Sequence, residues 1–271
     1  MPRLRFPLAL CVAISLLTIL TLPQPRAASP PGTSPSDTAG RVPVLIELFT
    51  SEGCSDCPPA DSLLQKLDRL QPVAGAELIV LSEHVDYWDD IGWRDPFSSH
   101  QYSVRQEDYA HQFGIASPYT PQMVVDGKIE FVGSDERRAI QAIANETKTA
   151  KVALNLSDAH FDSNKRIALH IESGPMPADS PSNSANVMLA VADESDESHV
   201  IHGENGGRTL KHVAVLRNLA QVGSVDKTTG FSQDVSIDAR NVGSGNLRVV
   251  AIVQEKTAGK VWRVSSLRLS R

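Results

Sequence analysis

Apolar residues in the first half of the chain fall into short runs that are typical of buried strands. Val44–Thr50 and Leu78–Ser82 are almost entirely apolar, and short runs of this kind favour strands that are covered on both faces. Gln122–Val125 and Lys128–Val132 flank Asp126-Gly127, a dipeptide that strongly favours a two-residue hairpin turn. The pattern therefore predicts two strands followed later by a hairpin.

Three further segments have the signals of helices. Asp61–Leu70 carries four leucines at helical spacing, and a second helix is expected over Ser99–Phe113. A third is predicted from Ser134 to about Lys148, because acidic residues fill its first turn and a lysine lies near its end. The order strand, helix, strand, helix, hairpin, helix is that of the thioredoxin fold. We therefore expect an α/β thioredoxin-like domain over residues 42–149.

From about residue 151 the pattern changes to alternating apolar and polar positions. Seven such segments follow one another: KVALNL, RIALHIES, ANVMLAVAD, HVAVLRNL, QDVSID, LRVVAIVQ and VWRVSSLRL. Strands at this spacing, separated by polar or glycine-containing turns, predict an all-β, sandwich-like domain over residues 150–271. The acidic run Asp193–Ser198 is expected to be a solvated loop, and HGENGGRTLKH (202–212) the loop of a long hairpin.

The N-terminus predicts export. Arg3 and Arg5 precede an uncharged apolar run, Phe6–Leu22, and a segment rich in proline, serine and alanine follows. This is the organisation of a signal peptide, so we expect residues 1–27 to be the signal and residues 28–41 a Pro/Ser-rich linker. The protein is then periplasmic or secreted. The alternative is an uncleaved segment, and only in that case is a membrane expected as a partner.

Composition and charge indicate a folded soluble protein that does not bind nucleic acid. The 271 residues are 41% hydrophobic and 21% charged, which is ordinary for a folded soluble protein and sufficient for two cores. The net charge is −6, and no cluster of lysine and arginine follows the first few residues. Because nucleic-acid-binding proteins carry a basic surface, we expect no nucleic acid as a partner.

The cysteines predict a reactive thiol pair. Of the three cysteines, Cys11 lies inside the predicted signal, which leaves Cys54 and Cys57 in the sequence C-S-D-C. A crosslink that closes so short a loop adds little stability, and Pro58 favours the start of a helix directly after it. The positive end of a helix stabilises a thiolate. We therefore expect Cys54 to be the exposed, attacking thiol and Cys57 the resolving one.

Two further segments are expected at the same rim as the cysteines. Ligands of open sheets gather beyond the carboxyl ends of parallel strands; His84 follows the second strand there, and Thr120-Pro121 precede the antiparallel hairpin strand. Cys54, Cys57, His84, Thr120 and Pro121 are thus the candidate catalytic residues. His84 has three interpretations: a proton donor or acceptor, a copper or zinc ligand beside the two thiolates, or a core histidine that bonds a backbone carbonyl.

Four segments resemble a known family: ELFTSEGCSDCPPADSLL, HVDYWDDIGW, YTPQMVVDG and, less specifically, GENGGRTLKH. They resemble an uncharacterised family of exported thioredoxin-like proteins, domain of unknown function 1223. The resemblance implies a thioredoxin-like fold, an exported location and a cis bond at Thr120-Pro121, and it brings no known substrate. Unlike thioredoxin, the chain has Gly53 in place of the usual tryptophan. Glu52 and Asp56 bracket Cys54 with negative charge, which opposes thiolate formation and predicts a weaker oxidant than the strongly oxidising periplasmic enzymes.

The sequence therefore predicts an exported thiol–disulfide oxidoreductase that acts on protein thiols or disulfides, without a cofactor or a bound metal. One alternative is a copper- or zinc-handling protein that uses Cys54, Cys57 and His84. The other is a non-catalytic protein-binding module in which the disulfide only closes a turn.

Overall fold

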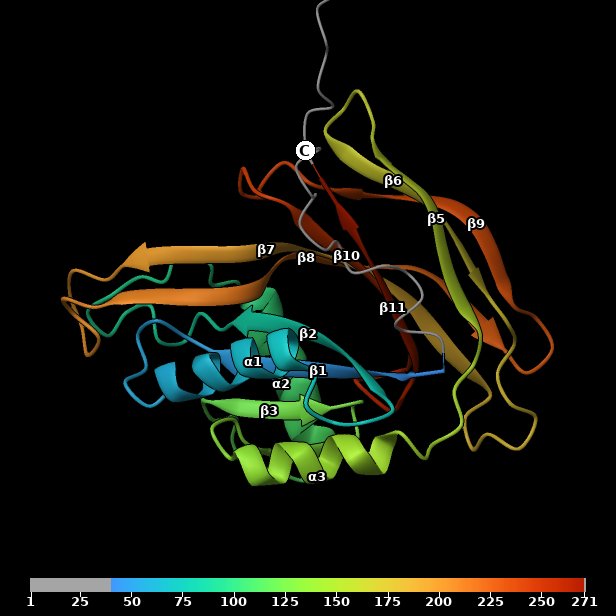
Figure 1. Ribbon diagram of the computed structural model, residues 1–271, viewed down its shortest axis with the longest axis horizontal. Coiled ribbons are helices and arrows are strands. Elements are labelled where there is room, and N and C mark those ends of the chain that lie inside the picture. The colour runs from blue at the N-terminus through green and yellow to red at the C-terminus, as the bar shows by residue number, and fades with distance from the viewer. Residues whose placement is uncertain (1–39, 271) are drawn as a thin grey trace, which may run out of the picture. The chain divides into compact units, whose positions relative to one another are not determined.

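A computed structural model describes residues 40–270, which form one compact unit of eleven strands and three helices (Figure 1). The predicted signal peptide and nearly all of the predicted linker lie outside the described residues. Within the part of the chain that is described, no helix is long and apolar enough to cross a membrane.

The first half contains the predicted elements in the predicted order. These are β1 (Val42–Thr50), α1 (Pro58–Leu70), β2 (Ala76–His84), α2 (His100–Phe113), β3 (Gln122–Val125), β4 (Ile129–Val132) and α3 (Glu136–Glu146).

The second half contains seven strands, as the alternating pattern predicts. These are β5 (Leu154–Phe161), β6 (Arg166–Ser173), β7 (Ser184–His199), β8 (Thr209–Asp226), β9 (Phe231–Asp238), β10 (Leu247–Glu255) and β11 (Val261–Leu269). The acidic run Asp193–Ser198 lies within β7, so the prediction of a loop there is wrong. Residues 200–208 form the turn of a long β7–β8 hairpin, which we call the hairpin tip.

The predicted fold class, a thioredoxin-like domain followed by an all-β domain, is wrong. One mixed sheet of eight strands runs through both halves in the order β11-β10-β7-β8-β2-β1-β3-β4. β1 and β2 are parallel, and β8 joins the free edge of β2 in parallel where Ser82 pairs with Val215. The apolar pattern shows which faces of a strand are buried but not which strand lies beside it, so the sequence did not reveal this junction.

Helices and a second sheet cover the eight-stranded sheet. α1 packs on β1, β2 and β8, and α2 lies on the opposite side of the sheet (Figure 1). The three-stranded sheet β5-β6-β9 packs on the second half of the large sheet, where Leu169, Leu189 and Val249 share one apolar core. The described chain is therefore mostly β, and α1 is held between the first-half strands and the β7–β8 hairpin.

Candidate functional site

Cys54 and Cys57 form a disulfide at the start of α1. β1 ends at Thr50, the chain turns through the C-S-D-C segment, and Cys57 is the residue that precedes the first helical turn, with prolines at the next two positions. Cys54 is 2% exposed and Cys57 is fully buried. The expectation that Cys54 is an exposed thiol is therefore wrong for the disulfide form.

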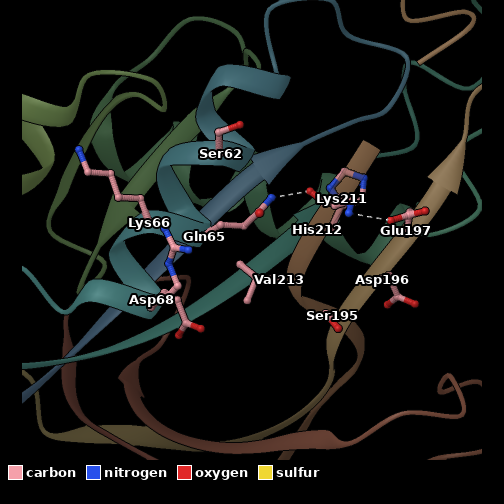
Figure 2. Close-up of a pocket in the computed structure, with 11 residues that line it drawn as sticks. Ser62, Gln65, Lys66, Asp68, Ser195, Asp196, Glu197, Lys211, His212 and Val213 are labelled. Carbon is pink, nitrogen blue, oxygen red and sulfur yellow. Dashed lines mark hydrogen bonds and ion pairs between the residues drawn. The ribbon is translucent and has the colours of Figure 1, made fainter. Parts of the chain in front are cut away.

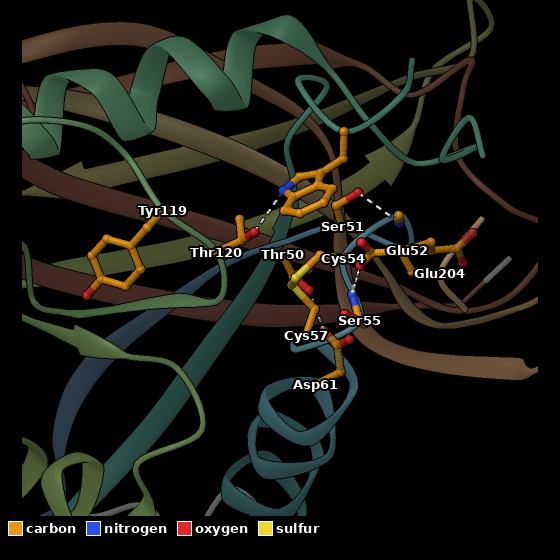
Figure 3. Close-up of a disulfide and its surroundings, with 12 residues drawn as sticks. Thr50, Ser51, Glu52, Cys54, Ser55, Cys57, Asp61, Tyr119, Thr120 and Glu204 are labelled. Atoms are coloured by element: carbon orange, nitrogen blue, oxygen red, sulfur yellow. Dashed lines mark hydrogen bonds between the residues drawn. A yellow bond between two sulfur atoms is a disulfide. The ribbon is translucent and has the colours of Figure 1, made fainter. Parts of the chain in front are cut away.

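Thr120 lies near the disulfide (Figure 3), at the edge that the strand directions predicted, and the Thr120-Pro121 peptide bond is cis. Trp88 connects this segment to the cysteine loop. Its indole Nε1 donates to Thr120 Oγ1 over 2.8 Å, and a Cβ atom on Gly53 would lie only 3.1 Å from Cβ of Trp88. The glycine directly before Cys54 therefore makes room for a tryptophan from another segment of the chain.

His84 is buried at the end of β2 and does not bond a backbone carbonyl through its ring. Its Nδ1 lies 2.7 Å from Asp95 Oδ2, and the same carboxylate oxygen accepts the backbone N–H of Glu52 over 2.8 Å. Burial opposes the charge of Asp95, but its pairing with His84 and the backbone N–H groups of Glu52 and Phe97 lower the pKa of its carboxyl below the usual value. Through its hydrogen bonds with His84 and Glu52, Asp95 connects the cysteine loop to the end of β2.

A second buried histidine, His212 of β8, lies against the cysteine loop from the other side. Its Nε2 is 3.1 Å from Glu52 Oε1 and its Nδ1 is 3.8 Å from Asp61 Oδ1. Asp61 belongs to the first turn of α1 and accepts a hydrogen bond from Thr50 Oγ1 over 3.0 Å. The rings of His84 and His212 meet edge to face with centroids 4.6 Å apart. The two histidines and their carboxylates therefore form one buried cluster beside the disulfide.

The hairpin tip closes over the same loop. Asn205 is fully buried, and its amide donates to the backbone carbonyls of Glu52 and Cys54 over 2.9 Å each. Glu204 accepts the backbone N–H of Ser55 over 3.0 Å (Figure 3). These bonds connect residues about 150 positions apart, so the second half of the chain helps to fix the conformation of the C-S-D-C segment.

Sequence comparison assigns the chain to a family. The family described as "Protein of unknown function (DUF1223)" matches residues 45–254. The chain belongs to this family. The match includes the cysteine loop, the hairpin tip and His212, which together form the site described above. No curated protein sequence matches the chain.

Two solved structures resemble this DUF1223 chain over most of its length. Protein AGR_C_4864 from Agrobacterium tumefaciens is 25% identical, with a TM-score of 0.63, and the likeness covers 84% of this chain and 94% of that one. HBP35 of Porphyromonas gingivalis is 14% identical with a TM-score of 0.56, and the likeness covers 84% of this chain and 75% of that one. The HBP35 likeness shows the fold alone.

An open cleft of about 620 Å³ lies next to the buried cluster, between α1 and the β7–β8 hairpin (Figure 2). Its lining is polar and of mixed charge, and His212 belongs to it. The residues around it are Ser62, Gln65, Lys66, Asp68, Arg69, Ser195, Asp196, Glu197, Lys211, His212 and Val213. The cleft borders the second histidine and not the disulfide.

Within residues 40–270 no group of three or more histidine, cysteine, aspartate or glutamate side chains is placed to hold a metal ion. The Nδ1 atom of His84 is occupied by Asp95. The two sulfurs that a metal site would need are joined to each other.

Several site residues were not found by sequence reasoning. Asp95, Asn205 and His212 were not candidates, although GENGGRTLKH was among the segments that resemble the family. Glu47 of β1 is also fully buried. It bonds Arg105 and Tyr109 of α2, away from the cysteine loop.

Proposed function

We propose that the protein exchanges thiols and disulfides with protein substrates through Cys54 and Cys57. The observation that carries the proposal is the position of this pair at the first turn of α1, beside Thr120-Pro121. The positive end of the helix dipole favours the thiolate. The relation to thioredoxin-like proteins belongs to this proposal and concerns these site residues only.

The exchange needs no reagent beyond the substrate. In the oxidising direction, a substrate thiolate attacks Sγ of Cys54, the bond to Cys57 breaks, and Cys57 leaves as a thiolate. A second substrate thiolate then attacks the substrate sulfur of the mixed disulfide and releases Cys54. The substrate loses two electrons and becomes a disulfide, while the cysteine pair gains them. The reducing direction is the reverse of these steps.

The residues around Cys54 and Cys57 favour a reactive disulfide over one that only stabilises the fold. The disulfide closes only the two residues between Cys54 and Cys57, so it restricts the unfolded chain little. Meanwhile three separate segments contribute to the shell of the cysteine loop: the β2–α2 loop with Trp88 and Asp95, the segment before β3 with Thr120, and the hairpin tip with Asn205. A turn that needed only to be closed would not require such a shell.

Trapping of mixed disulfides tests the proposal. In Cys57→Ser the resolving thiol is missing, so substrates attacked by Cys54 should accumulate as covalent adducts that a reductant releases. Cys54→Ser is the matched control and should trap few or none. Equal trapping by both variants, or by neither, contradicts the assignment of Cys54 as the nucleophile. Neither variant traps a partner if the protein is only a binding module.

We also propose that the exchange takes place outside the cytoplasm, because Arg3, Arg5 and the apolar run Phe6–Leu22 have the organisation of a signal peptide. Mass spectrometry of the native protein should find a mature chain that begins near Ala28. A chain that retains Met1 would favour the anchored form.

A further inference from the structure

Two carboxylates of the buried cluster lie close in sequence to the cysteines. Glu52 precedes Cys54 by two residues and is fully buried, and Asp61 follows Cys57 by one helical turn and is 6% exposed. Side chains on a helix lean toward its N-terminus, and Figure 3 places the Asp61 carboxylate beside Cys57. Uncompensated, two negative charges here would repel a cysteine thiolate, since a like charge disfavours ionisation.

Both carboxylates are directed at the same imidazole ring. Glu52 Oε1 lies 3.1 Å from Nε2 of His212, and Asp61 Oδ1 lies 3.8 Å from Nδ1. The His212 side chain is 1% exposed, and Nδ1 has no hydrogen-bond partner within the described residues. An imidazole ring held between two buried carboxylates is in the arrangement that favours imidazolium.

The groups around His212, taken together, favour its protonated form. Burial works against the proton, but the hydrogen bonds and charges of Asp61 and Glu52 raise the pKa of His212 to about 10. His84 faces the ring from β2 with a centroid distance of 4.6 Å, and Asp196 of β7 adds a further negative charge nearby. Two carboxylates that bond or nearly touch the ring outweigh one neighbouring histidine.

We propose that His212 is a positioning residue for the exchange reaction: as a cation contributed by the second half of the chain, it compensates Glu52 and Asp61 and thereby keeps the thiol of Cys54 easy to ionise. This inference rests on the proposed function of the cysteine pair. It also revises the expectation that Glu52 opposes the thiolate, because that carboxylate is bonded to His212, Ser198 and Trp93.

The pKa of the Cys54 thiol in the reduced protein tests the inference without any substrate. The rate of alkylation of Cys54 is followed against pH, with the modified peptide identified by mass spectrometry. His212→Gln should raise the thiol pKa by about one unit or more, which slows alkylation about tenfold at a pH below both values. His199→Gln, an exposed histidine of the same hairpin, is the control and should leave the pKa unchanged. An unchanged thiol pKa in folded His212→Gln overturns the inference.

A variant of opposite sign covers the case in which His212→Gln fails to fold. Glu52→Gln removes one anion and keeps the cation, so it should lower the pKa of Cys54. A merely structural role for the pair predicts lower stability and no fall in the thiol pKa, and that result also overturns the inference. Because alkylation needs no partner protein, failure here is distinct from failure to trap mixed disulfides, which bears on the proposed function.

Discussion

The side-chain amide of Asn205 donates to the backbone carbonyl of Cys54 over 2.9 Å, although 151 positions separate the two residues. The same amide group also donates to the carbonyl of Glu52. The conformation of the C-S-D-C segment is therefore not fixed by local sequence alone. It depends on a hairpin tip that only the second half of the chain supplies.

Asn205→Ala should lower the free energy of unfolding by about 1–3 kcal/mol, since it leaves two buried carbonyls without a donor. Asn155→Ala replaces an exposed asparagine of β5 and should change stability by less than about 0.5 kcal/mol. Urea unfolding of the oxidised proteins measures both values. Equal effects in the two variants would show that the Asn205 bonds contribute nothing to stability.

Gly127→Ala should be far more harmful than Gly114→Ala, although both glycines have positive φ, 64° and 67°. A Cβ atom on Gly127 would lie 2.3 Å from the carbonyl oxygen of Gly259, while one on Gly114 meets nothing within 4 Å. We expect a cost of about 1 kcal/mol at Gly114 from the backbone alone and about 3 kcal/mol or more at Gly127. Thermal unfolding of both variants checks the difference, and similar melting temperatures would contradict it.

Arg248→Met should destabilise the protein by about 3 kcal/mol. This buried arginine of β10 bonds Asp68 of α1 and Glu194 of β7. Its loss leaves Asp68 without its cation, while Glu194 keeps Arg268. Arg240→Met removes an arginine that is 70% exposed and pairs with Asp238 two residues away, so that variant should stay within about 0.5 kcal/mol of the wild type. Denaturant midpoints give both values; a small loss at Arg248 would contradict the role of this link.

The stability that His212 contributes should fall at alkaline pH. Its pKa rises from 6.5 to about 10 on folding, so the folded state binds the proton more tightly than the unfolded state. The contribution is complete below about pH 6.5 and is lost as the pH rises through 10, by up to about 1.4 kcal/mol per pH unit. Unfolding free energies of wild type and His212→Gln should therefore converge between pH 6.5 and 10. A constant difference over that range would contradict a protonated His212.

Local features of the fold could be predicted from the sequence. The dipeptide Asp126-Gly127 identified the β3–β4 hairpin, and both residues adopt the positive φ that such a turn requires. Most helices and strands lie within a few residues of their predicted bounds, but β5 and β8 extend beyond theirs, and β7 continues through an acidic run. There, Glu197 points to solvent, while Asp193 is buried and pairs with Arg217. The acidic side chains are therefore accommodated by solvent or by arginines without interrupting the strand.

Long-range pairings could not be predicted. Strand direction placed Thr120-Pro121 at the edge where β1 ends, because β3 runs antiparallel to β1 and begins opposite Phe49. His84 pairs with Asp95, which lies in the loop after β2. Glu52 pairs with His212, which lies in a strand of the second half of the chain. A hydropathy pattern carries no information on which buried carboxylate meets which imidazole. For the same reason, the pairing of β2 with β8 at Ser82 and Val215 could not be predicted from the sequence.

The junction of β2 with β8 has a consequence for any dissection of the chain. A fragment that ends near residue 149 would present the outer edge of β2, a buried and mostly apolar strand, to solvent with its backbone groups unpaired. Such an edge templates pairing with another copy, so the fragment should self-associate. It would also lack Asn205 and His212. Residues 40–149 therefore do not form an independent functional unit. Any activity measured on them would come from a cysteine loop that lacks its contacts with Asn205 and His212.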